Sequence, residues 1–190
     1  VVSGIGKVNM AVCTQILIDI FSVDTVINTG VAGSLNNILE IGDIVLSRCA
    51  QQHDMDVSPL GDPVGIIPRM DESVFAADET LVKLAKEACE KANSDIICHV
   101  GKVVSGDQFI ADGEKKQYLI DTFEGDCAEM EGAAMAQVAY LNHVPFLIIR
   151  AISDKADNSG HMDYPTFAKQ AITHTVALLK EMYTLLIERR

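Results

Sequence analysis

Two acidic segments hold the residue types best suited to chemistry in this chain. Glu129 and Glu131 stand two positions apart, and Asp154 closely follows Arg150 and the apolar run 145–149. Both segments lie where a strand is expected to end, and ligands of open α/β sheets bind at the carboxyl ends of strands. Carboxylates gathered at that edge predict acid/base chemistry on a small polar molecule.

Each of these residues also has a structural interpretation. Glu129 and Glu131 would share one face of an extended segment. Their small, apolar neighbours make two unpartnered charges costly, which favours a functional site. Asp154 could instead cap the next turn, and Arg150 could serve as an ion-pair partner in the core. Burial would raise the pKa of Asp154 and a close arginine would lower it, so the sequence leaves its charge state open.

Hydrophobic periodicity and helix-breaking residues divide the chain into alternating elements. Residues 51–70, rich in proline and glycine, are predicted to form a loop. Helices are predicted over residues 7–21, 79–93, 112–123, 131–142 and 164–188, and strands over 25–29, 44–47, 96–105, 126–130 and 145–152. The sequence therefore predicts one α/β domain over residues 1–190, with a mixed, mostly parallel sheet and helices on both faces.

Composition narrows the possible partners. The 190 residues carry a net charge of −12, which argues against nucleic acid, because that affinity depends on cationic side chains. No apolar run approaches the roughly 20 residues of a membrane span. The five cysteines include no CxxC pair, which is typical of reduced thiols in the cytoplasm. The five histidines lack metal-ligand spacing, so we expect no metal site, and His53 and His161 are interpreted as loop residues or as satisfied histidines.

Three turns of small residues could approach a ligand closely. Gly4-Ile5-Gly6 lacks the third glycine of a dinucleotide-binding loop and the hydroxyl residue of a phosphate-binding loop, so it is either a tight turn or a backbone approach to a ligand. Residues 28–34 contain two glycines that would leave room for a ligand. In residues 105–110, Phe109 could stack on a planar base and the backbone of Ile110 could read its edge, unless Phe109 belongs to the core.

Six motifs occur in an order and spacing that resemble one known family. They are Ser3-Gly4-Ile5-Gly6-Lys7, Asn28-Thr29-Gly30-Val31-Ala32-Gly33, Gln52-His53-Asp54-Met55-Asp56, Ser105-Gly106-Asp107-Gln108-Phe109, Ala128-Glu129-Met130-Glu131-Gly132 and Arg150-Ala151-Ile152-Ser153-Asp154. Over essentially its whole length the chain resembles the 5′-methylthioadenosine/S-adenosylhomocysteine nucleosidases of the purine nucleoside phosphorylase superfamily. The resemblance implies a nucleoside phosphorylase-like fold and hydrolysis of the adenine N-glycosidic bond of 5′-alkylthio nucleosides, without a cofactor.

The resemblance also implies individual roles. Asp154 would protonate N7 of adenine, Glu131 would hold the ribose hydroxyls, and Glu129 with Arg150 would help to place the attacking water. Protonation makes adenine a better leaving group, and carboxylates stabilise the oxocarbenium-like ribose. The other implied substrate-binding residues are Ile5, Val31, Ala32, Gly33, Val57, Phe109, Ile110, Met130 and Ser153. The family is homodimeric, which implies that a partner loop near residues 60–68 closes the pocket.

One expectation concerns the start of the chain. Members of this family carry a strand before the Ser-Gly-Ile-Gly-Lys turn and, just after that strand, a glutamate that takes a proton from water. This sequence begins at Val1, two residues before the turn. We therefore expect the 190-residue chain, as an N-terminally truncated form, to have impaired activity and one unpaired strand edge.

Three alternatives stay open at the level of sequence. A purine nucleoside phosphorylase would need a basic phosphate pocket, and the few arginines do not cluster early in the chain. A futalosine-type nucleosidase would differ only in its substrate. A non-catalytic nucleoside-binding module is the alternative of another class, and it would bind an adenine nucleoside without releasing adenine.

Overall fold

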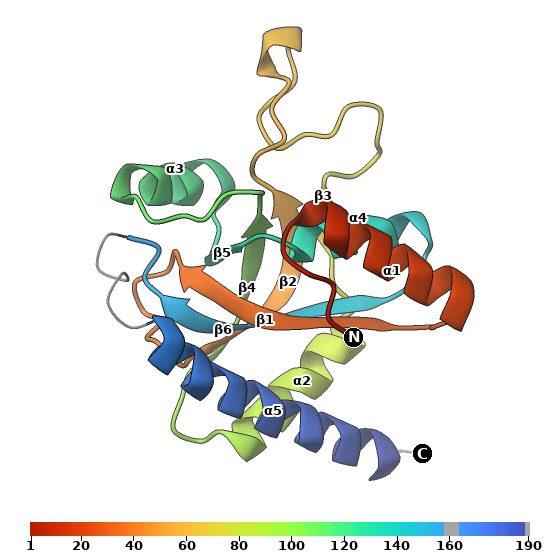
Figure 1. Ribbon diagram of the computed structural model, residues 1–190, viewed down its shortest axis with the longest axis vertical. Helices are drawn as coiled ribbons and strands as arrows, with labels where there is room; N and C mark the ends of the chain where they lie inside the picture. The colour runs from red at the N-terminus through yellow and green to blue at the C-terminus, as the bar shows by residue number, and fades with distance from the viewer. Residues whose placement is uncertain (158–163, 189–190) are drawn as a thin grey trace.

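The computed structural model describes residues 1–157 and 164–188 (Figure 1). In this part of the chain six strands alternate with five α-helices and one short 3₁₀ helix. The strands are β1 (Val26–Ser34), β2 (Ile44–Gln52), β3 (Val74–Ala76), β4 (Cys98–Ser105), β5 (Cys127–Glu129) and β6 (Phe146–Asp154). The helices are α1 (Lys7–Phe21), η1 (Ser58–Leu60), α2 (Glu79–Ala92), α3 (Gly113–Phe123), α4 (Gly132–Leu141) and α5 (Tyr164–Glu188).

The strands form one mixed sheet in the order β3-β2-β4-β5-β1-β6, and β6 also pairs with β2. That last pairing joins the two sides of the sheet, so β2, β4, β5, β1 and β6 form a closed ring. The two longest ladders, β1–β6 and β2–β4, are parallel, as is β4–β5, whereas β1–β5, β2–β3 and β2–β6 are antiparallel. The prediction of a mixed, mostly parallel sheet is confirmed, but the closure between β2 and β6 was not predicted.

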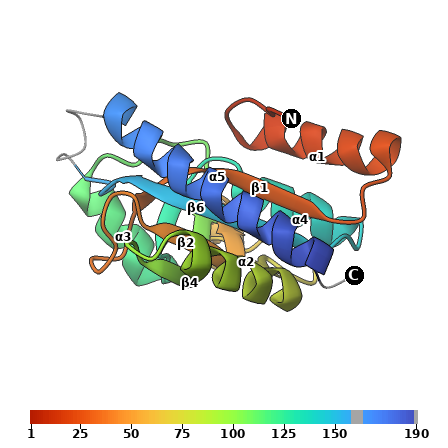
Figure 2. The same ribbon diagram turned by 90° about the horizontal axis from the view of Figure 1, so that it is seen from below.

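Helices cover both faces of the sheet, as expected. Helices α2 and α5 pack together on one face, and α1 packs with α4 on the other (Figures 1 and 2). Strand β6 is sandwiched between these layers, and all nine of its residues are buried. An apolar strand buried on both faces can carry charged groups such as Arg150 and Asp154 only where partners meet them.

Element boundaries follow the sequence predictions closely, with three differences. The helices predicted over 7–21 and 164–188 are α1 and α5, and the side chain of Asp112 caps α3 by accepting from the N–H of Glu114 at 3.2 Å. Strand β1 continues to Ser34, although glycines normally weaken a strand, because β6 pairs with it as far as Gly33. Strand β2 likewise extends into the predicted loop, and the three-residue edge strand β3 was too short to predict.

Candidate active site

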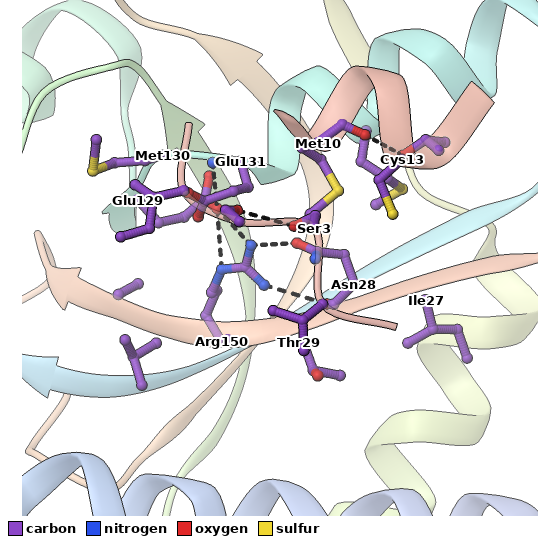
Figure 3. Close-up of a pocket in the computed structure, with 18 of the residues that line it drawn as sticks. Ser3, Met10, Cys13, Ile27, Asn28, Thr29, Glu129, Met130, Glu131 and Arg150 are labelled. Carbon is purple, nitrogen blue, oxygen red and sulfur yellow. Dashed lines mark hydrogen bonds and ion pairs between the residues drawn. The ribbon is translucent and has the colours of Figure 1, made fainter. Parts of the chain in front are cut away.

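A cavity of about 710 Å³ opens between α1 and the sheet (Figure 3). Its walls come from residues 1–5, from α1, from residues 26–33 of β1, from residues 128–131 and from the end of β6. Pockets of 300–1,000 Å³ are typical of small-molecule sites. The predicted site residues that line it are Ile5, Val31, Ala32, Gly33, Phe109, Glu129, Met130, Glu131, Arg150, Ser153 and Asp154.

Two predicted site residues do not line this cavity in the described chain. Val57 directly precedes η1, on a segment that projects away from the body of the molecule (Figure 1). Ile110 is buried, and its side chain packs with α3 in a separate apolar cluster. Their expected contacts with a nucleoside therefore stay predictions.

Glu129 is held by protein donors on both of its oxygens. Its side chain is 2% exposed, and it accepts from Arg150 Nη2 at 2.5 Å and Nε at 3.1 Å. The hydroxyl of Ser105 and the backbone N–H groups of Glu131 and Gly132 also donate to it. Burial alone would raise the pKa of Glu129, but Arg150 and these hydrogen bonds together lower it. Glu129 is thus an anion that also caps the first turn of α4.

The other end of this ion pair is equally satisfied. The guanidinium of Arg150 donates to the carbonyl of Asn28 at 3.3 Å, to the side-chain oxygen of Asn28, and to the carbonyl of Ile149 at 3.1 Å. A Cβ on Gly30 would lie 3.4 Å from Arg150 Cζ, so the glycine leaves room for the guanidinium beside β1. Arg150 is therefore the core ion-pair partner that the sequence allowed, and its partner is Glu129 (Figure 3).

Glu131 stands at the same strand-to-helix junction but is bonded more sparsely. The backbone N–H of Gly6 donates to its Oε1 at 2.7 Å, which ties the turn before α1 to the start of α4. Burial raises the pKa of Glu131, the charge of Glu129 adds to this, and the hydrogen bond from Gly6 opposes it. A carboxylate has about four acceptor positions, so most of those on Glu131 are available to a ligand.

Asp154 ends β6 and is only 7% exposed. Its Oδ1 accepts from the N–H of Ala156 at 2.8 Å, and its Oδ2 accepts from the hydroxyl of Ser153 at 2.9 Å. The predicted turn cap is thus present, while the residue also lines the cavity. A Cβ on Gly33 would lie 2.7 Å from Asp154 Oδ1, so only glycine fits beside this carboxylate.

Two apolar side chains lie near the cavity mouth. Phe109 is 64% exposed and Ile5 is 74% exposed, and both line the cavity. Phe109 is therefore not a core residue, and its ring is available to a flat ligand.

The chain is similar to known proteins over nearly its whole length. A family model described as the phosphorylase superfamily matches residues 1–184. A 5′-methylthioadenosine/S-adenosylhomocysteine nucleosidase of Staphylococcus carnosus is 40% identical over 181 residues, which make up 95% of this chain and 78% of that protein. The chain belongs to this nucleosidase family.

Solved structures place the family's fold on the same residues. A futalosine hydrolase of Helicobacter pylori has a TM-score of 0.90 and 36% identity, covering 96% of this chain and 77% of that one. An Asp-to-Asn mutant of a Helicobacter pylori nucleosidase, solved with 5′-methylthioadenosine in its active site, has a TM-score of 0.90 and 34% identity, covering 96% and 78%. The nucleoside phosphorylase-like fold predicted from the motifs is confirmed.

The structure adds residues to this candidate site that sequence reasoning left without a role. Asn28 and Ser105 complete the hydrogen bonding of the ion pair. Both stand in motifs quoted for the family, at strand positions facing β6 and β5. The available signal was that each stands in one of these motifs and directly follows a pair of apolar residues, Val26-Ile27 or Val103-Val104.

His53 corrects one sequence interpretation. It follows β2 in a bend, as predicted, but its buried ring has no hydrogen-bond partner on either nitrogen within the described residues. Burial lowers the pKa of His53, while the charge of Asp54 opposes this. His53 is thus a loop residue, as one of the two interpretations had it, and its ring is unsatisfied within the described residues. His161 lies outside the described residues.

Residues 1–157 and 164–188 contain neither a metal-binding cluster nor a membrane-spanning helix. Within them no group of three or more His, Cys, Asp or Glu side chains is arranged to hold a metal ion. No helix in the same ranges is both long and apolar enough to cross a membrane.

Proposed function

We propose that this protein hydrolyses the N-glycosidic bond of 5′-methylthioadenosine and S-adenosylhomocysteine, releasing adenine and the 5-alkylthioribose. The observation that carries the proposal is the pair of carboxylates Asp154 and Glu131 in one cavity, each with acceptor positions that the described residues leave unused. One group is needed at the base and one at the sugar, and the two lie on different walls.

In the proposed reaction Asp154 protonates adenine at N7, so that the base leaves without a full negative charge. A positioned general acid contributes roughly 10²–10⁴-fold to the rate. Glu131 accepts hydrogen bonds from the ribose hydroxyls and stabilises the positive charge that develops on the sugar. Phe109 stacks on the base, and Ile5 contacts the 5′ substituent.

Glu129 and Arg150 support this site chiefly by position. Their hydrogen bonds are already taken up by each other and by Asn28, Ser105 and backbone groups. Little acceptor capacity is left on Glu129 for a water molecule. The pair fixes the backbone at residues 131 and 132, from which the side chain of Glu131 enters the cavity.

The cavity favours hydrolysis over phosphorolysis. Arg150 is the only lysine, arginine or histidine among the described residues that line it, and its guanidinium is 1% exposed and ion-paired. A phosphate nucleophile would need a free cation there. Water, which is neutral, has no such requirement.

We further propose that the protein is a homodimer. Val8, Val12, Ile16 and Ile20 are all between 47% and 73% exposed, and their spacing of four places them on one outer face of α1. An apolar helix stripe of this kind is typical of a covered surface. In the dimer, the projecting segment around Leu60, which is 83% exposed, would close the partner's pocket.

The test is release of free adenine from 5′-methylthioadenosine and S-adenosylhomocysteine, with and without phosphate. Inosine and a futalosine-type nucleoside serve as alternative substrates. Adenine release that does not depend on phosphate supports the proposal. Cleavage that requires phosphate would contradict it. Cleavage of the futalosine-type nucleoside alone, or binding of a nucleoside without its cleavage, would contradict it as well.

Sedimentation of the 190-residue chain tests the homodimer, and a monomer would contradict it.

A further inference from the structure

Three segments that are distant in the sequence meet beside the cavity through a closed set of hydrogen bonds. Lys7 Nζ donates to Asp54 Oδ1 at 2.6 Å. Asp54 Oδ2 accepts from the backbone N–H of Asp107 at 2.9 Å. Asp107 Oδ1 in turn accepts from the backbone N–H of Lys7 at 2.8 Å. Each of the three residues is thus bonded to both of the others.

The ion pair of Lys7 and Asp54 is better shielded than an ordinary surface ion pair, whereas Asp107 is exposed. The side chains of Lys7 and Asp54 are 18% and 15% exposed, whereas exposed pairs contribute little because water and salt screen them. Lys7 Nζ also donates to Gln52 Oε1 at 2.9 Å, and Gln52 is fixed by Gln137 of α4 at 2.5 Å. Burial raises the pKa of Asp54, but the hydrogen bonds from Lys7 and Asp107 outweigh this and lower it.

The three residues stand directly beside the two walls of the cavity. The residue before Lys7 is Gly6, whose N–H holds the sugar-side carboxylate Glu131 at 2.7 Å. Two residues after Asp107 comes Phe109, the aromatic ring on the base side. Strands β4 and β5 already fix Ser105 beside Glu129, but the turn that holds Gly6 is about a hundred residues from Phe109 in the sequence. The contacts among Lys7, Asp54 and Asp107 therefore help to set the position of this turn relative to the segment that carries Phe109.

We propose that Lys7, Asp54 and Asp107, here called the clamp, are positioning residues that hold the sugar wall and the base wall of the pocket at the spacing of an intact nucleoside. The proposal deepens the proposed function and rests on it. None of the three is required to touch the reacting atoms. The clamp acts through Gly6 on Glu131 and through the chain between Asp107 and Phe109.

A positioning role and a purely stabilising role have different effects on the affinity for small and large ligands. Free adenine contacts the base wall alone, so its affinity depends little on the spacing of the walls. A 5′-alkylthio nucleoside contacts both walls at once, so its affinity depends on the clamp. A contact that only stabilised the fold would alter both affinities alike or neither.

The experiment compares calorimetric dissociation constants for adenine and for 5′-methylthioformycin, a nucleoside analogue whose carbon–carbon bond to the base resists hydrolysis. Lys7→Met and Asp54→Asn remove either side of the ion pair. The matched control is Lys83→Met, which breaks an exposed pair on α2 with Glu79. We expect each clamp variant to weaken analogue binding about tenfold, the loss typical of one charged hydrogen bond. Adenine binding should change less than about twofold on the same scale.

Two further variants separate positioning from fold damage. The double variant Lys7→Met/Asp54→Asn should bind the analogue no more weakly than either single variant, because both remove the same contact. Lys7→Arg, which keeps the charge, should recover most of the affinity. Additive losses, equal losses for adenine and analogue, or unchanged analogue binding in Lys7→Met would overturn the proposal. Failure of the unaltered chain to bind the analogue at all would instead contradict the proposed function.

Discussion

The cavity contains two kinds of acidic residue, and the contrast between them separates structure from chemistry. Glu129 shares a buried ion pair with Arg150, and protein donors occupy both of its oxygens. Glu131 and Asp154, here called the open carboxylates, accept only one and two protein hydrogen bonds respectively within the described residues. A group whose hydrogen bonds are already used holds the fold, whereas one with unused acceptor positions can bind or protonate a ligand.

Carboxylates that are close in the sequence can have different roles in the site. Glu129 and Glu131 are two residues apart and flank the same turn. Their pKa values are nonetheless displaced in opposite directions. Burial raises both and Arg150 lowers both, but only at Glu129, its ion-pair partner, do Arg150 and the hydrogen bonds outweigh burial. Opposed shifts in neighbouring carboxylates are typical of functional sites.

The largest expected effect tests Asp154 as the proton donor. Asp154→Asn keeps the size of the side chain and removes the acid, so adenine release should fall by roughly 10²–10⁴-fold. Binding of 5′-methylthioformycin should change only a few-fold. Single-turnover adenine release and calorimetry make the two measurements. If binding collapses while bound substrate still turns over, Asp154 is a binding group and the contrast fails.

Loss of the buried ion pair should lower the free energy of unfolding rather than the rate of the reaction. Arg150→Met leaves the Glu129 charge buried without its partner, which costs about 3–5 kcal/mol of unfolding free energy. Urea unfolding measures this, with Arg48→Met as the control because Arg48 is exposed on β2. Adding Glu129→Gln to Arg150→Met should restore part of the loss. A stable, merely inactive Arg150→Met would instead place Arg150 in the chemistry.

Glu131 should show an intermediate effect on nucleoside affinity. Glu131→Gln replaces charged hydrogen bonds to the ribose by neutral ones, which should weaken binding of the analogue about tenfold to hundredfold. Because the pKa of Glu131 is raised, the wild-type carboxylate gains a proton at a higher pH than an ordinary glutamate. Affinity should therefore decline as pH falls through that raised pKa, and this decline should be missing in Glu131→Gln. A shared pH profile would remove Glu131 from the site.

The smallest effect concerns His53, a buried side chain that, unlike the ion pair, has no hydrogen-bond partner in the described part of the chain. Its pKa is lowered in the folded state, so the unfolded chain binds a proton more readily. As pH falls below the unfolded pKa of about 6.5, this difference destabilises the fold by at most about 1.4 kcal/mol per pH unit. Urea unfolding between pH 5 and 8 gives the free energy of unfolding at each pH. We expect this free energy to change less steeply with pH in His53→Gln than in the unaltered chain. Identical pH dependences would mean that folding does not lower the pKa of the ring.

Much of the fold was predictable because its signals are local. The spacing of Leu84, Ala85 and Ala88 marks α2, and the buried apolar run of β6 marks the centre of the sheet. The ring closure was not predictable, since the pairing of β2 with β6 joins residues about a hundred positions apart. Strand β3 is only three residues long, and because all three are apolar the sequence shows no alternation of apolar and polar residues there.

The site was predictable as a set of residues but not as a set of bonds. Motifs and the family resemblance identified Glu129, Glu131, Arg150 and Asp154, and the cavity contains all four. Which carboxylate pairs with Arg150 depends on the register of β1, β5 and β6, and that register is a tertiary property. The unsatisfied ring of His53 was likewise invisible, because its burial comes from Gly106 and α3.

The ring of strands has a consequence for the slowest motions of the molecule. Arg150 is paired in register with Gly30 on one side and with Val45 on the other, so it sits where the ring closes. Its amide can meet deuterated solvent only after strands separate around it, an opening that approaches global unfolding. The rate of hydrogen exchange at this amide would therefore report global unfolding, whereas amides in the turn before α1 would exchange faster.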